Sequence, residues 1–177
     1  MRFAFATLFV IAIARAAAAA PAAEPASTPW QLGLVGGALQ PLGSMKFSHE
    51  RGLDAGMRVS WTSRLGLGVE AAVDYSPLPH VPTADGTRFD TTYATAAIGP
   101  RFAAGWSRLA FAIAAGGGVA IDHTITTDVA PAIEAGLEIQ VTVVDGGGIL
   151  FTGGGTRAFG SLGYEYAWGM GGLALSF

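Results

Sequence analysis

Residues 53–76, LDAGMRVSWTSRLGLGVEAAVDYS, alternate between two kinds of side chain over almost their whole length. The odd positions are apolar, whereas the even positions are polar or very small; the apolar set is Leu53, Ala55, Met57, Val59, Trp61, Leu65, Leu67, Val69, Ala71, Val73 and Tyr75. A period of two is typical of β-strands with two unlike faces. With a tight turn at Ser63 and Arg64, the stretch predicts a β-hairpin whose arms, of about 11 residues, are long enough for tilted strands to cross a membrane.

The same alternation recurs along the chain and predicts eight strands. Their expected ranges are 30–40, 53–63, 65–76, 91–103, 107–121, 129–143, 148–154 and 162–177. Short connections near Ser63, Gly105 and Asp145 alternate with longer ones, as in outer-membrane barrels, where short turns lie on the periplasmic side. The sequence therefore predicts an all-β fold, a single antiparallel up-and-down transmembrane β-barrel of eight strands.

The polar face indicates which way the strands face. It consists mostly of Gly, Ala and Ser with sparse charges of both signs, which fits a crowded lumen better than an open solvated surface. The apolar face would then meet lipid, where a closed sheet pairs every backbone group. We expect an interior charge network of Arg58, Arg101 and Arg108 with Glu70, Glu134 and Glu138, with the individual pairs left open.

The overall composition supports this interpretation. Only 13% of the 177 residues are charged while 51% are hydrophobic, and there is no cysteine. Beyond residue 20 no apolar run approaches the roughly 20 residues of a membrane helix. A net charge of −3 with scattered basic residues gives no basis for nucleic-acid binding.

The first residues have the composition of a secretory signal. Arg2 precedes the apolar stretch 3–13, and small residues follow it. We expect a cleaved signal peptide at residues 1–22, with the cut among residues 19–22, then a disordered lead-in at 23–29 and the barrel at 30–177.

The aromatic residues give a further expectation and one conflict. Six aromatic residues lie near predicted strand ends or in the last strand: Trp61, Tyr75, Tyr93, Trp106, Tyr166 and Trp168. They would form girdles at the two membrane interfaces, or else they are ordinary packing residues. Tyr164, Tyr166 and Trp168, however, have the opposite parity to Leu173, Leu175 and Phe177. Either a bulge in residues 169–172 puts both sets on the lipid face, or the aromatics point into the lumen.

In the layout of strands and connections described above, the whole mature chain resembles the small outer-membrane β-barrel families of Gram-negative bacteria, including the membrane domain of outer membrane protein A. The most specific local element of this resemblance is at the end of the chain. Gly172, Leu175 and Phe177 match the order of glycine, hydrophobic residue and terminal aromatic in the closing-strand signal of those families. The resemblance implies a location in the cell outer membrane, contact with membrane lipid, and recognition of these residues by the barrel assembly machinery.

No catalytic or metal-binding constellation is recognisable in the sequence. The chain has three histidines, His49, His80 and His123, and adjacent Ser48, His49 and Glu50 cannot converge on one reacting atom as a triad does. We expect a monomer without cofactors that has a structural or surface-interaction role through its outer loops. The alternatives are a barrel enzyme acting on lipid or peptide, and a soluble secreted β-barrel that binds an apolar ligand.

Overall fold

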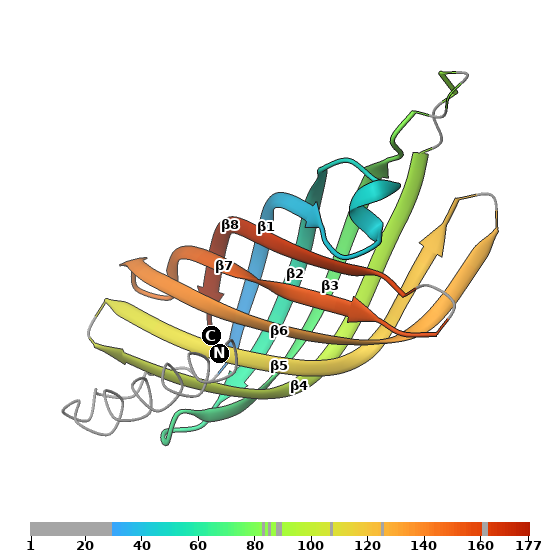
Figure 1. The fold of residues 1–177 in the computed structure, drawn as a ribbon. Coiled ribbons are helices and arrows are strands. Elements are labelled where there is room, and N and C mark those ends of the chain that lie inside the picture. Colours follow the sequence, from blue (N-terminus) through green and yellow to red (C-terminus); the bar gives the residue numbers. More distant parts are fainter. Residues whose placement is uncertain are drawn as a thin grey trace, which may run out of the picture.

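Eight antiparallel strands close into one barrel in the computed structural model, which describes residues 30–82, 84, 86–87, 90–106, 108–124, 126–160 and 163–177. Each strand pairs with the next, and β1 pairs with β8 to complete the ring (Figure 1). The strands are β1 (Trp30–Pro41), β2 (Gly52–Thr62), β3 (Leu67–Pro79), β4 (Asp90–Trp106), β5 (Leu109–His123), β6 (Thr127–Val144), β7 (Gly147–Ala158) and β8 (Glu165–Ser176). The predicted fold class is confirmed.

The alternation in the sequence becomes the two surfaces of the barrel wall. In β3, Val69 and Val73 are each 50% exposed, whereas Glu70 and Asp74 between and beside them are buried. The register keeps this parity across neighbours, since Val73 lies opposite Met57 on β2 and Ala96 on β4. Apolar side chains therefore cover the outside, and polar side chains fill the inside.

The two ends of the barrel differ. At one end are the short connections 63–66, 107–108 and 145–146, and here Phe177 N donates a hydrogen bond of 3.1 Å to Trp30 O. Gly66 and Gly146 have φ angles of 81° and 74°, a region that favours glycine in tight turns. We call the opposite end the outer end, and Figure 1 shows β3 to β6 extending farthest there. Its connections include the 3-10 helix η1 (Met45–Phe47), which follows β1.

Strand β7 runs farther than the sequence predicts. The sequence predicts a strand over residues 148–154, yet β7 continues to Ala158. The reason is packing, because a Cβ on Gly154 would lie 2.7 Å from Cζ2 of Trp168 on β8. Gly154 makes room for a large lumen side chain, so here this glycine belongs to a strand.

The phase conflict in the last strand resolves without a bulge. Residues 169–172 pair in continuous register with β1 and with β7. Tyr166 and Trp168 are consequently buried in the lumen, while Leu173 and Leu175 face outward. The expected start of this strand at residue 162 is also wrong, because β8 begins at Glu165.

The expected signal peptide and lead-in, residues 1–22 and 23–29, lie outside the described residues. Within the described part of the chain, no helix is long and apolar enough to cross a membrane.

Candidate functional site

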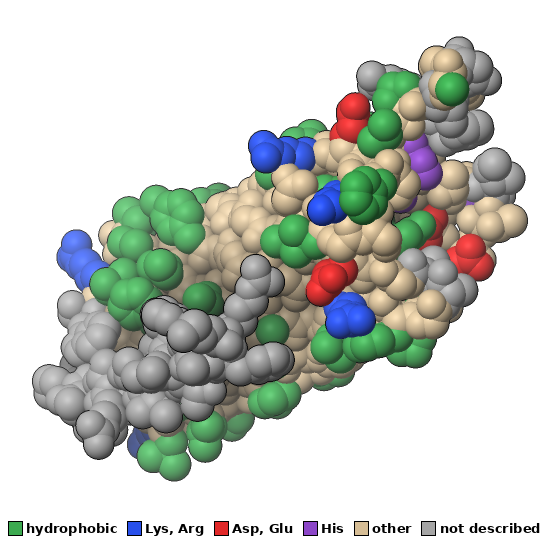
Figure 2. All heavy atoms as spheres, in the orientation of Figure 1, with side chains coloured by type: hydrophobic (Ala, Val, Ile, Leu, Met, Phe, Trp, Pro, Cys, Tyr) green, Lys and Arg blue, Asp and Glu red, His purple; other side chains and the backbone are tan. Residues whose placement is uncertain are grey.

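The outer wall of the barrel is an apolar belt. Large hydrophobic side chains are exposed on all eight strands, among them Leu34, Met57, Val69, Ile98, Phe111, Ile133, Phe151 and Leu173. On the face that Figure 2 shows, acidic and basic side chains gather toward the outer end, and few charged groups lie on the wall below them. Exposed apolar surface of this extent marks an interaction with another apolar phase, such as a membrane.

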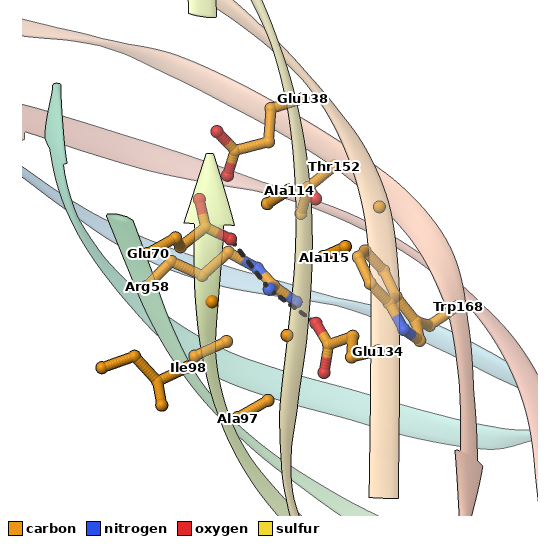
Figure 3. Close-up of a pocket in the computed structure, with 14 residues that line it drawn as sticks. Arg58, Glu70, Ala97, Ile98, Ala114, Ala115, Glu134, Glu138, Thr152 and Trp168 are labelled. Carbon is orange, nitrogen blue, oxygen red and sulfur yellow. Dashed lines mark hydrogen bonds and ion pairs between the residues drawn. The ribbon is translucent and has the colours of Figure 1, made fainter. Parts of the chain in front are cut away.

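Inside the barrel, Arg58 of β2 is the centre of a charge network. Its guanidinium lies 2.9 Å from Glu134 Oε1 through Nη1, and 3.3 Å from Asp74 Oδ1 through Nη2. The same group stacks over the ring of Trp168, 4.5 Å from the ring centroid. Arg58 is only 3% exposed, so its charge depends on these partners (Figure 3).

Arg101 of β4 forms the second half of the network. Its Nη2 donates to Glu138 Oε2 at 2.7 Å, and its Nη1 donates to Thr62 Oγ1, also at 2.7 Å. Glu70 joins the two arginines, because Oε1 lies 3.7 Å from Arg58 Nη1 and Oε2 lies 3.2 Å from Arg101 Nε. The network thus links strands on opposite sides of the lumen.

Five of the six residues expected in the interior network come together: Arg58, Glu70, Arg101, Glu134 and Glu138. The sixth, Arg108, does not, because it lies in the turn between β4 and β5, where its side chain is exposed. Its carbonyl oxygen accepts a hydrogen bond from Thr142 N, which fixes the turn. Asp74 also belongs to the network, although the sequence analysis did not include it. It lies an even number of positions from Glu70 in the same strand, so its side chain lies on the same face, and this was the signal in the sequence.

Carboxylates outnumber guanidiniums among the buried side chains that the structure describes. The buried set contains two arginines, Arg58 and Arg101, and six acidic residues, namely Asp54, Glu70, Asp74, Asp122, Glu134 and Glu138. Little free volume remains among them, since the small cavity beside Arg58, Glu134 and Trp168 measures about 20 Å³ (Figure 3). That volume is comparable to a single water site. The lumen is therefore filled by side chains.

The aromatic residues expected to form an interfacial girdle divide between the two faces of the barrel wall. Trp61 and Tyr75 are exposed on the outer wall, whereas Tyr93, Tyr166 and Trp168 are buried inside. The Trp106 side chain lies outside the described part of the structure. Parity explains the difference, because the inner residues share their phase with buried polar neighbours such as Thr95 and Thr156.

At the outer end, histidines and tyrosines close the mouth of the lumen. The rings of His49 and His80 are 4.0 Å apart between centroids, and Tyr164 lies 5.7 Å from His49. Tyr93 contacts both Tyr164 and Tyr166, at 5.6 Å and 5.2 Å. Burial lowers the pKa of His49 below its ordinary value, and the neighbouring His80 lowers it further. We call these five residues the mouth cluster.

Ser48, His49 and Glu50, next to the mouth cluster, do not form a catalytic triad in the part of the chain that the structure describes. Ser48 Oγ is hydrogen-bonded to His49 Nδ1 at 2.9 Å, but it also contacts Met45 O, and His49 Nε2 has no hydrogen-bond partner to orient it. His123 is exposed and bonds to Thr127 through Nδ1. No group of three or more potential metal ligands is found in the part of the chain that the structure describes.

The C-terminal residues that match the closing-strand signal lie along the junction of β8 with β1. Leu175 and Phe177 point outward, and Phe177 is 63% exposed. Gly172 has a steric role, because a Cβ there would lie 1.9 Å from Leu34 O on β1.

Comparison with known proteins gives structural likeness without sequence likeness. No protein-family model matches the chain, and no curated protein matches it. Neisserial surface protein A superimposes with a TM-score of 0.67 at 7% identity, covering 85% of this chain and 98% of that one. The Yersinia pestis outer membrane protein Ail in a phospholipid bilayer nanodisc gives a TM-score of 0.53 at 13% identity, covering 85% and 100%. Ail in complex with the heparin analogue sucrose octasulfate gives 0.50 at 16% identity, covering 84% and 96%.

At such low identities, these likenesses concern architecture alone. They cover nearly the full length of the compared chains, so the whole barrel is shared and not only a few strands. This chain therefore has the eight-stranded fold of small outer-membrane β-barrel proteins.

Proposed function

We propose that this chain is an integral outer-membrane β-barrel protein without enzymatic activity, which contributes to the cell envelope through its rigid barrel and to surface contacts through its outer loops. The observation that carries the proposal is the pairing of an apolar outer wall with a charge-filled lumen. A soluble barrel that binds an apolar ligand would have the reverse arrangement, with its apolar side chains inside.

A filled lumen favours a structural role over transport. The network of Arg58 and Arg101 crosses the middle of the barrel, and the mouth cluster covers its outer end. No continuous aqueous path of useful width is expected through such an interior. Interactions would then occur at the outer loops, where the charged side chains of Lys46, Glu50 and Arg51 are exposed.

Partners follow from the same proposal. Membrane lipid would cover the apolar belt, and the barrel assembly machinery would recognise Gly172, Leu175 and Phe177 during insertion. The chain would act as a monomer, because closing the sheet leaves no free strand edge for pairing.

Cell fractionation combined with a heat-modifiability gel tests the proposal. The protein should remain with the outer membrane after removal of soluble and inner-membrane proteins, and unboiled samples should migrate differently from boiled ones because the folded barrel resists detergent. Recovery in the soluble periplasmic fraction would contradict the proposal and support the soluble alternative. Release of product from membrane lipid or peptide by the purified barrel would support the enzyme alternative.

A further inference from the structure

Within the described part of the chain, the carboxyl group of Glu70 receives no hydrogen bond from either arginine of the lumen network. Arg58 Nη1 lies 3.7 Å from Oε1, beyond hydrogen-bond reach, and donates to Glu134 at 2.9 Å. Arg101 Nε lies 3.2 Å from Oε2 but donates its single hydrogen to Glu138 Oε2, also at 3.2 Å. Oε2 of Glu70 is therefore buried without a donor, in a residue that is only 6% exposed.

The carboxyl group of Glu70 meets the carboxyl group of Glu138, which comes from β6. Figure 3 shows the two groups pointing toward one another, and their side chains are in hydrogen-bonding contact. Two ionised carboxylates are acceptors only, so they cannot hydrogen-bond to each other. A protonated carboxyl group has an O–H donor and can form this bond. The contact therefore requires one proton.

The charge of the network also favours a proton at this place. Its ion pairs join two arginines to four carboxyl groups, those of Glu70, Asp74, Glu134 and Glu138. If all four were ionised, two negative charges would remain without a cation. All four residues are buried, and a buried charge that is not compensated is so costly that the group becomes neutral instead.

The strands packed around Glu70 and Glu138 supply no other counter-charge among the residues that the structure describes. The buried arginines are Arg58 of β2 and Arg101 of β4. The strands β1, β5, β7 and β8 contribute uncharged residues there, namely Gly33, Ala114, Thr152 and Trp168. A metal ion does not fit the described residues either, because they contain no group of three or more potential ligands. A proton is the counter-charge that this geometry can accept.

We propose that Glu70 and Glu138 share one proton at neutral pH and form a proton-binding site in the lumen. Arg101 Nη2 donates to Glu138 at 2.7 Å and keeps that side chain ionised, so the proton resides on Glu70. Glu70 is then a neutral carboxylic acid that donates its hydrogen to Glu138. The resulting hydrogen bond joins β3 to β6 across the lumen, beside the ion pairs of the two arginines.

Infrared spectroscopy of the refolded full barrel tests this assignment. A protonated carboxyl group has a C=O stretching band that is separate from the carboxylate bands, and a detergent without ester groups keeps this region clear. Carbon-13 at the side-chain carboxyl of glutamate distinguishes Glu70 from buried aspartates such as Asp54. An exposed glutamate is ionised at neutral pH, so the spectrum should contain the shifted band of one protonated glutamate. Absence of that band would overturn the proposal.

Two matched variants locate the proton. Gln at position 70 has an amide that can donate to Glu138 in place of the carboxyl hydrogen, so Glu70→Gln should remove the band and leave the urea midpoint unchanged or higher. Glu134→Gln makes the same chemical change at a carboxylate that accepts from Arg58, so the band should remain and the urea midpoint should fall. A band that survives Glu70→Gln, or an equal fall of the midpoint in both variants, would contradict the proposal.

If the variants do not refold, exchange into D2O still decides whether the proton is buried. The hydrogen on Glu70 lies inside the closed barrel, so the band of the unmodified protein should shift slowly after transfer. A shift that is complete at once would place the protonated carboxyl group at the surface and overturn the proposal.

Discussion

Gly154 of β7 lies directly opposite Trp168 of β8, and the missing side chain of the one provides the space for the ring of the other. Gly136 of β6 continues the same row, since a Cβ there would lie 2.7 Å from Cη2 of Trp168. The guanidinium of Arg58 lies over this ring, 4.5 Å from its centroid, and Trp168 Nε1 donates to Thr156 Oγ1 at 3.2 Å. Strand glycines and the charge network are thus parts of one packing arrangement.

Gly154→Ala should destabilise the barrel. The added methyl meets Trp168 and also Ala135 O, which would lie 2.2 Å from the Cβ, so either the ring or the backbone must move. We expect a loss of about 1–3 kcal/mol in the free energy of unfolding, measured by urea titration in lipid vesicles. Gly117→Ala is the control, because its Cβ would have no neighbour within 4 Å; equal effects of the two changes would refute this account of the glycines.

Arg58→Met should cost far more than Arg108→Met. Removing the buried guanidinium leaves Glu134 and Asp74 without their closest cation, and breaking a buried ion pair typically costs about 3–5 kcal/mol. The exposed Arg108 should contribute within about 0.5 kcal/mol. The same urea titration measures both, and a small effect at Arg58 would show that the network does not stabilise the lumen.

The sequence was sufficient to predict the eight strands and the two faces, because alternation directly reports which residues share a face. The prediction for Arg108 was wrong, because alternation indicates the direction of a side chain only within a strand, and Arg108 lies in a turn. The sequence did not decide whether the Trp168 side chain faces the lumen or the lipid, because this depends on whether residues 169–172 contain a bulge. Only the pairing of these residues with β1 and β7 shows that the register is continuous. The contact of His49 with His80 joins two irregular connections, for which the sequence contains no periodic signal.

An arginine introduced on the apolar belt should lower the free energy of unfolding more, the deeper it lies in the membrane. Ile98→Arg lies within β4, is 64% exposed, and would place a charge among acyl chains, so we expect a loss of about 2–4 kcal/mol in the free energy of unfolding in vesicles. Leu65→Arg is the control at the short-turn end, where the side chain is 83% exposed and the expected loss is about 0–1 kcal/mol. Similar losses at both positions would argue against a lipid-covered wall.

Phe177→Ser should impair assembly in cells more than it changes the finished barrel. Its side chain is exposed at the end of β8, so it contributes little packing, and the proposed role is recognition during insertion. We expect less heat-modifiable protein in the outer membrane, with nearly unchanged urea stability after refolding in vitro. Phe47→Ser, in the first outer connection, is the matched control. Normal assembly of the Phe177→Ser variant would contradict the proposed role of Phe177 in recognition by the assembly machinery.

The central claim is that the apolar face of the strands meets lipid while the polar face lines the lumen. Fluorescence quenching by brominated phospholipids tests it most directly, using two refolded proteins that each retain a single tryptophan. Trp61 lies on the outer wall, and Trp168, 5% exposed, lies inside between Gly154 and Arg58. The account predicts strong quenching of Trp61 and protection of Trp168. Equal quenching of the two, or stronger quenching of Trp168, would contradict it.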